Sequence, residues 1–307
     1  MERPRAIGGS DAAVVLGISP WKTRYQLWRE LVGESEPVAE ENERLRWGKL
    51  LEEPVAREYA ERTGRKIRRV NRTLVHPELP YVTGHLDRDV VRGDDPEKRI
   101  LEVKTTDTWN RTEWGPSGSD EVPDHYLTQV QHYMALTGAD ICDVAVLVGG
   151  NDFRVLHVPR NDRLIGAMLE RYVDFWERHV EAKVPPEVET LGDAKTRWPL
   201  HDPSKTVVAT PDVLSLLRDL DDTRAAARAE EKRAEEILKQ LYSLLEDAEA
   251  VVADDGKPLA TFKSQNSTRV DMGALREAHA DLVREFERKS TTRVLRITKA
   301  GKEKLSA

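Results

Sequence analysis

Helical and extended patterns alternate over the first 182 residues, and this alternation constrains the fold most strongly. Apolar residues at helical spacing occupy residues 10–17, 19–31, 43–62, 124–136 and 161–182. Extended patterns occupy residues 66–75, 81–91, 99–105, 144–148 and 153–158. Ser10 is the expected cap of the first helix, Ser19-Pro20 the expected start of the second, and Asn161 the cap of the last. The pattern predicts an α/β domain over residues 1–183.

The chain changes character after residue 183. Residues 184–211 carry five prolines and little periodicity, which favours a proline-rich linker or a wrapping arm. Residues 214–245 form a charged helix with Leu and Ala stripes, typical of a coiled coil or helical hairpin. A β-hairpin turning at 254–256, a helix from Asp271 and a strand near 294–297 are expected to follow. We therefore predict a helical and β appendage over residues 212–307.

The composition excludes some classes of protein and leaves others open. A net charge of −7 argues against a chain coated in positive charge, although a local basic groove could still bind DNA. The single cysteine, Cys142, excludes an internal disulfide and a thiolate metal cluster. The first residues show no signal peptide, and no apolar run approaches the ~18 residues of a membrane span. We expect a cytoplasmic protein that does not enter a membrane.

The extended segment 99–105 carries the chemistry with the sharpest pattern. Because side chains alternate along a strand, Glu102 and Lys104 should point the same way. Asp87 lies fifteen residues earlier in the preceding extended segment. Two acids on neighbouring strands can share a hard cation such as Mg²⁺, and a lysine beside it can orient or deprotonate water. The alternative is an ordinary ion pair on an exposed strand.

Glu52 is a third candidate acid, on the helix predicted over 43–62. It falls in line with an expected core-facing stripe that also holds Leu45, Gly48, Val55 and Tyr59. A buried acid needs a partner or a cation, which favours Glu52 over the neighbouring Glu53 for the site. The alternative is a partly exposed helix acid.

Gln129 shares one helix face with Tyr126 and Tyr133, at steps of three and four residues. An amide between tyrosines on a core face suggests a hydrogen-bonding function at the site. An ordinary, hydrogen-bonded core glutamine is an equally good interpretation.

These segments, taken in order, resemble the YqaJ-type viral recombinase family, relatives of lambda-phage exonuclease. The resemblance covers roughly the first 180 residues. Its motifs are Ile7–Ala13, Trp47–Glu52 with Tyr59 and Gly64, Gly84–Asp87, Glu102–Lys104 and Tyr126–Gln131. One departure is clear: the metal acid is often followed by glycine in the family, whereas Asp87 precedes Arg88 and Asp89.

The resemblance implies a PD-(D/E)xK, or restriction-endonuclease-like, core: a central mixed sheet flanked by helices that cuts DNA with Mg²⁺, or with Mn²⁺ in its place. Asp87, Glu102 and the backbone carbonyl of Val103 would then hold the metal. Lys104 would act on the attacking water. Glu52 would support the metal site, and Gln129 would organise Lys104.

The resemblance also implies a site for a terminal 5′-phosphate. In lambda-type enzymes a serine and an arginine seven residues earlier grip this group, and Ser10 and Arg3 have that spacing, with Arg5 as a nearby substitute. Gly8-Gly9 would let the backbone approach closely, and a helix N-terminus attracts phosphate. The alternative for Ser10 is a simple helix cap.

The function that follows from the resemblance is a 5′→3′ exonuclease on linear double-stranded DNA with a free end, producing single strands for annealing-type recombination. The expected partners are a single-strand annealing protein and further copies of the chain, in a ring of three by family analogy. Two alternatives stay open. One is an endonuclease on the same core for restriction or defence, and the other is a catalytically silent DNA-binding or assembly protein.

Overall fold

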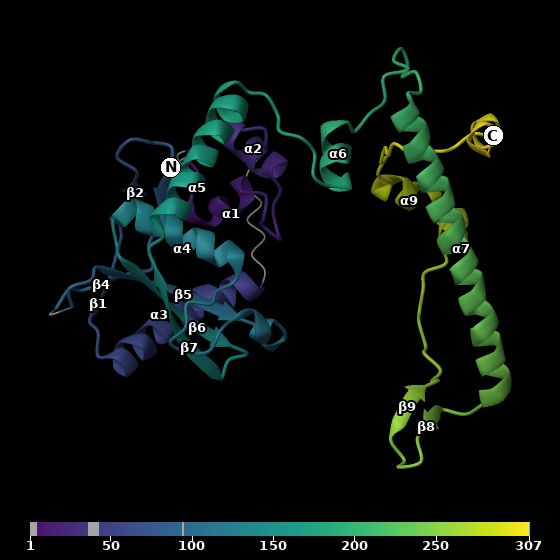
Figure 1. The fold of residues 1–307 in the computed structure, drawn as a ribbon. Coiled ribbons are helices and arrows are strands. Elements are labelled where there is room, and N and C mark those ends of the chain that lie inside the picture. The colour runs from purple at the N-terminus through teal and green to yellow at the C-terminus, as the bar shows by residue number, and fades with distance from the viewer. Residues whose placement is uncertain (1–4, 36–42, 94, 307) are drawn as a thin grey trace. The chain divides into compact units, whose positions relative to one another are not determined.

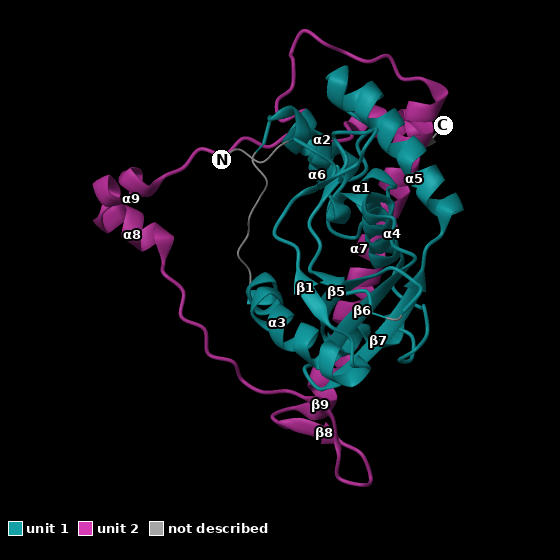
Figure 2. Ribbon diagram, turned by 90° about the vertical axis from the view of Figure 1, so that its left-hand side faces the viewer, with its two compact units in different colours: residues 1–197 teal, residues 198–307 magenta. Residues whose placement is uncertain are grey.

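The computed structural model describes residues 5–35, 43–93 and 95–306. It divides the chain into two compact units, residues 1–197 and 198–307 (Figure 2). The division falls inside the segment 184–211. That segment also contains a helix that the sequence did not indicate, α6 (Leu191–Arg197), in the first unit. The buried carboxylate of Asp193 fixes the start of α6, because it accepts hydrogen bonds from the backbone N–H of Glu189 and Thr190.

A five-stranded sheet forms the centre of the first unit (Figure 1). Its strands, in spatial order, are β1 (Ile67–Arg69), β4 (Arg88–Val90), β5 (Arg99–Thr106), β6 (Ile141–Val148) and β7 (Asp152–Pro159). Only β5 and β6 are parallel; the other neighbours within this sheet are antiparallel. The expectation of a mixed central sheet flanked by helices is confirmed. The hairpin β6–β7 is longer than the sequence indicated, because its pairing extends to Ile141 and Pro159.

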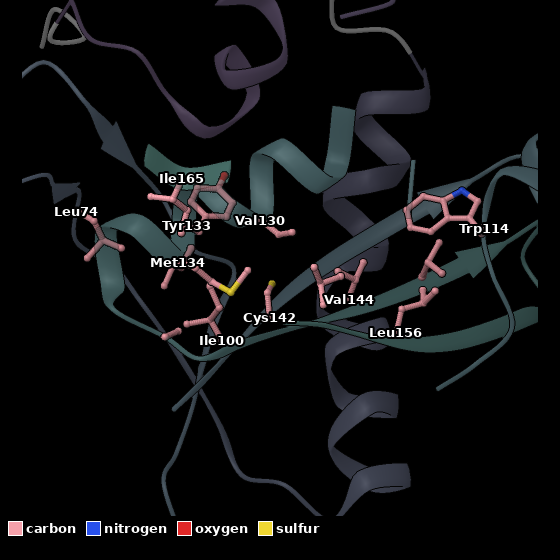
Figure 3. Packing of buried hydrophobic residues seen from close by; sticks show 14 of the residues in the cluster. Leu74, Ile100, Trp114, Val130, Tyr133, Met134, Cys142, Val144, Leu156 and Ile165 are labelled. Carbon is pink, nitrogen blue, oxygen red and sulfur yellow. The ribbon is translucent and has the colours of Figure 1, made fainter. Parts of the chain in front are cut away.

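Helices cover both faces of this sheet. On one face, α3 (Glu43–Thr63) packs Val55 and Tyr59 against Leu101 and Val103 of β5. On the other face lie α4 (Asp124–Thr137) and α5 (Asp162–Phe175), whose apolar side chains meet β5 and β6 in the core of Figure 3. Alternation along β5 then directs Glu102 and Lys104, like Ile100, to the α4 side. The prediction that the side chains of Glu102 and Leu101 point to opposite faces of the strand is therefore confirmed.

The N-terminal segment differs from the prediction in its helix starts. A short 3₁₀ turn, η1 (Gly9–Asp11), leads into α1 (Ala12–Val15), and Gly8 rather than Ser10 takes the cap position. The second helix, α2 (Arg24–Val32), begins after Thr23 rather than at Ser19-Pro20. Thr23 and Gln26 form a reciprocal capping box there, which satisfies two backbone N–H groups and outcompetes the serine.

Two of the long extended segments are broken in the structure. Residues 66–75 contain β1 and the separate β2 (Leu74–Val75), while 81–91 contain β3 (Thr83–Gly84) and β4. β2 and β3 pair with each other outside the main sheet. Gly84 explains part of this arrangement, since a Cβ there would lie 2.7 Å from Leu136 of α4. The predicted helix over 161–182 is confirmed as α5, capped by Asn161, and a π-helical segment, Trp176–Glu181.

The second unit is built on one long helix, α7 (Pro211–Leu245). The other elements of this unit are β8 (Ala250–Val252), β9 (Pro258–Thr261), α8 (Met272–Ala278), α9 (Ala280–Phe286) and α10 (Lys299–Ser306). The long helix and the β-hairpin are as predicted. The strand expected near 294–297 is wrong, because β8 and β9 pair only with each other and offer it no neighbour. Across the described residues, no helix is long and apolar enough to cross a membrane.

Candidate active site

Two carboxylates lie side by side at the junction of β4 and β5. Asp87 occupies a bend immediately before β4, not a strand as predicted, and its Oδ2 accepts a 2.8 Å hydrogen bond from the backbone N–H of Val103. Glu102 directly precedes Val103 on β5 and is only 3 % exposed. Arg88 pairs with Leu101 in the antiparallel register of β4 and β5. One step further, the same register places Asp87 opposite Glu102.

Lys104 and Gln129 complete a hydrogen-bonded group around Glu102. The Lys104 ammonium donates to Glu102 Oε1 at 2.7 Å and to Gln129 Oε1 at 3.0 Å. The Gln129 amide donates to Glu102 Oε1 at 3.0 Å and to the Tyr133 hydroxyl at 3.1 Å. Because Lys104 needs an acceptor and Glu102 needs a donor, the two fix the orientation of the amide between them. Gln131 points elsewhere, to Pro159 and Asn161, as its helical phase predicts.

One oxygen of this group has no partner. Among the described residues, Glu102 Oε2 is the buried side-chain oxygen or nitrogen left without a hydrogen bond. A bare buried carboxylate oxygen is costly and calls for a ligand. Asp87 and this oxygen suit a hard cation that keeps several of its waters. The described residues hold no cluster of three or more His, Cys, Asp or Glu side chains suited to a metal, so the protein would supply two carboxylates plus, by prediction, the Val103 carbonyl.

The electrostatics of the two acids favour the same interpretation. Burial, and then the charge of Glu102, raise the pKa of Asp87 to about 8, despite the hydrogen bond from Val103. Without a cation, therefore, the Asp87 carboxyl is largely protonated at neutral pH. Burial lowers the pKa of Lys104, but Glu102, through its charge and hydrogen bond, outweighs that effect and leaves the pKa raised. Lys104 is thus an ammonium, a donor that can orient an oxygen.

Glu52 lies beside this group but is held by an arginine. Its Oε1 accepts a 2.6 Å hydrogen bond from Arg88, and Glu53 Oε2 accepts one of 2.8 Å from the same guanidinium. The Arg88 side chain is 4 % exposed and also donates to the Asp87 carbonyl. The residue that departs from the family pattern therefore clamps Glu52 and Glu53 of α3 to the bend at Asp87. The predicted stripe is exposed at Leu45 and buried at Val55 and Tyr59.

A cavity of about 1900 Å³ opens over these residues. One wall is aromatic: the Lys104 ammonium lies 4.7 Å from the ring centre of Tyr126, whose ring is tilted against that of His125 with 4.1 Å between the ring centres. Trp21 meets His125 edge-on at 4.6 Å and is 65 % exposed. The cavity wall also includes Arg44, Trp47, Lys49, Thr108, Trp109 and Gly149.

Neither Ser10 nor Arg5 is among the described residues that line this cavity. Arg3 lies outside the described residues. Ser10 is exposed on η1 and is absent from the described residues that line the cavity. Arg5 donates to the carbonyl of Val32 at the end of α2. Close packing accounts for the glycine at position 9, because a Cβ there would lie 2.5 Å from the ring of Tyr133.

The fold and the site together define an α/β protein with a carboxylate–lysine centre on a mixed sheet. Residues 2–140 match the family model described as a YqaJ-like viral recombinase domain. The chain is 31 % identical, over 94 % of its length and 90 % of the relative's, to YqaJ of Bacillus subtilis (strain 168), an uncharacterized protein. The chain therefore belongs to the YqaJ family of viral recombinase-like proteins.

Two solved structures are more distantly similar. An alkaline exonuclease from Laribacter hongkongensis is 22 % identical, with a TM-score of 0.48 over 59 % of this chain and 90 % of that one. A phage-related exonuclease from Haemophilus somnus 129PT is 15 % identical, with a TM-score of 0.43 over 58 % of this chain and 96 % of that one.

Sequence reasoning missed two features of the site. The sequence offers Arg88 as a departure that could contact DNA or lie at the strand edge, whereas an arginine between buried strand positions signals a buried ion pair. Sequence reasoning also passed over Trp109, which follows β5 in η2 (Thr108–Glu113) and is 93 % exposed. A tryptophan five residues after the lysine of a strand motif carries no recognisable pattern by itself.

Proposed function

We propose that the chain is a metal-dependent DNA exonuclease that hydrolyses phosphodiester bonds of linear double-stranded DNA. The observation that carries the proposal is the buried, unpartnered Glu102 Oε2 at a cavity that Asp87 also lines; burial and the charge of Glu102 also raise the pKa of Asp87 to about 8. Such a pair is unfavourable for the protein alone and favourable with a divalent cation. Membership of a viral recombinase-like family supports DNA as the substrate.

The residues divide the work by their chemistry. Asp87 and Glu102, with the Val103 carbonyl, would hold Mg²⁺, or Mn²⁺ in its place, and this ion would lower the pKa of water and stabilise charge on phosphorus. Lys104, as an ammonium, would orient the attacking oxygen or bind the scissile phosphate. Gln129 keeps Lys104 beside Glu102, and Arg88 keeps Glu52 beside Asp87.

The decisive experiment compares DNA ends. The chain is incubated with 5′-phosphorylated linear duplex and with covalently closed circles of the same sequence, in Mg²⁺, in Mn²⁺ and in EDTA. We expect nucleotide release from linear DNA with metal, and none with Lys104→Ala; Asp120→Asn, an exposed carboxylate, serves as the matched control. Comparable cutting of closed circles would instead favour the endonuclease. Inactivity in every metal would favour the silent DNA-binding protein.

The finer points of the proposal come from the family resemblance and need their own tests. Digestion in the 5′→3′ direction predicts that label at the 5′ end is released before label at the 3′ end. A 5′-phosphate site at Ser10 and Arg3 predicts that Ser10→Ala slows digestion of phosphorylated ends more than of hydroxyl ends. A ring of three copies predicts three times the chain mass in solution. Co-purification with a single-strand annealing protein tests the recombination function.

A further inference from the structure

Trp109 presents a large apolar surface to water at the rim of the cavity. It belongs to η2, which begins two residues after β5 ends, and its side chain is 93 % exposed. Tryptophan normally buries most of its surface, so an almost fully exposed one marks a binding position. The cavity that it lines also contains Asp87, Glu102 and Lys104.

The segment that carries Trp109 is held firmly in place. Arg154 of β7 donates to the carbonyl groups of Trp114 and Gly115, at 2.8 and 3.1 Å, and its own side chain is 12 % exposed. Arg111 of η2 pairs with Asp152 at 3.1 Å. Trp109 is therefore exposed although the segment that carries it is anchored.

The other side of the turn is fixed by close packing. Gly149, at the β6–β7 turn, has φ 58°, and a Cβ there would lie 2.2 Å from the Thr108 hydroxyl. Its backbone N–H donates to the carbonyl of Thr106 at 2.8 Å. Asn110 Nδ2 donates to the Thr106 hydroxyl at 3.2 Å. These contacts leave the backbone of η2 little freedom to bury the indole.

We propose that Trp109 stacks on an unpaired nucleobase of the strand that enters the carboxylate–lysine site. This inference rests on the proposed nuclease function and adds the state of the substrate: a locally unpaired strand. A phosphodiester bound at Lys104 and Glu102 would lie near the end of β5, and η2 starts just beyond that end. Because each strand residue advances about 3.3 Å, Trp109 is within a few residues' length of the bound strand. The backbone then meets the cationic side chains of Lys104 and Lys49, and a base meets the indole. Within a duplex, stacking between neighbouring base pairs would hide the face of that base.

The test uses the full chain and a 12-nucleotide single strand carrying 2-aminopurine at successive positions, in EDTA so that no bond is cut. We expect quenching of 2-aminopurine at one or two positions with the unmodified chain, because stacking quenches this base. Trp109→Ala should abolish that quenching and weaken binding about 5- to 150-fold, the range of stacking on one base. Trp109→Phe should retain part of both. Phe286→Ala, which removes another exposed aromatic side chain, in the second unit, should change neither.

A second measurement separates this inference from the nuclease proposal. With Mg²⁺, Trp109→Ala should slow cutting of fully paired ends more than of ends with unpaired overhangs, since stacking offsets the cost of unpairing. Failure of the unmodified chain to cut any DNA refutes the proposed function. Normal cutting combined with identical quenching by the unmodified chain and Trp109→Ala, or with no quenching by either, refutes the stacking alone.

Discussion

The substitution of Asp87 by asparagine tests whether the carboxylates that would hold a cation make the metal-free protein less stable. Asparagine has the shape of the neutral carboxyl, and its Oδ1 can still accept the hydrogen bond from Val103. The substitution therefore removes only the ability to ionise. We predict that, without metal, Asp87→Asn is more stable than the unmodified chain at alkaline pH, that the difference shrinks as pH falls, and that it vanishes only below about pH 4.

The sign and size follow from the pKa. Burial and the charge of Glu102 raise the pKa of the Asp87 carboxyl to about 8 in the folded protein, against an ordinary value of 3.8. Between these limits the folded state binds more protons than the unfolded state, so the free energy of unfolding falls as pH rises. At 1.36 kcal/mol per pH unit, the loss between pH 4 and 8 amounts to at most about 6 kcal/mol. Asparagine should eliminate this slope.

The assay is hydrogen exchange of the β5 and β6 amides, followed by mass spectrometry in the full chain at pH 5 to 8.5 with EDTA. The pH-corrected protection of the unmodified chain should fall relative to Asp87→Asn as pH rises, while Asp120→Asn should follow the unmodified chain. Adding Mg²⁺ at pH 8.5 should restore protection to the unmodified chain and leave Asp87→Asn unchanged. Parallel pH profiles for the two proteins would refute the raised pKa and the cation argument built on it.

Three further predictions concern the support of the site. Gln129→Leu removes the amide that holds Lys104, so nuclease activity with Mg²⁺ should drop roughly 10- to 100-fold while the melting temperature changes little. His132 is buried and its pKa is lowered by burial to about 4, so the folded state resists its protonation. Stability should therefore fall as pH drops from 6.5 towards 4, by about 3 kcal/mol, and His132→Gln should flatten that part of a urea-unfolding profile. Gly9→Ala places a Cβ 2.5 Å from the Tyr133 ring, so it should cost about 1–3 kcal/mol and lower activity, measured by thermal melting and nucleotide release.

The sequence predicted much of the first unit because its signals are local. Alternation along β5 placed Glu102 and Lys104 on one face, and helical phase placed Gln129 on one face with Tyr126 and Tyr133. That Gln129 organises Lys104 was implied by the family resemblance. A cap such as Asn161 needs only the next few residues to act. These features depend on periods of two and 3.6 residues, which hold in any context.

What the sequence could not predict depends on partners far along the chain. The extended segment 81–91 is broken because β3 pairs with β2, while β4 pairs with β1 and β5. The strand expected near 294–297 has the right residues and no neighbouring strand. Arg88 reaches Glu52 across 36 positions of sequence, so its function as a clamp is invisible without the fold.

The glycine-led motif at the N-terminus connects these two kinds of information. The sequence Gly8-Gly9-Ser10 resembles a phosphate-binding turn, and the family resemblance predicts that it binds DNA ends. In the structure Gly9 lies against the Tyr133 ring, whose hydroxyl accepts the hydrogen bond of Gln129, which in turn accepts that of Lys104. Steric exclusion at Gly9 thus sets the position of the tyrosine, and a chain of three side chains transmits it to the site lysine. Close packing at a glycine therefore accounts for this part of the motif, whether or not Ser10 also meets a phosphate.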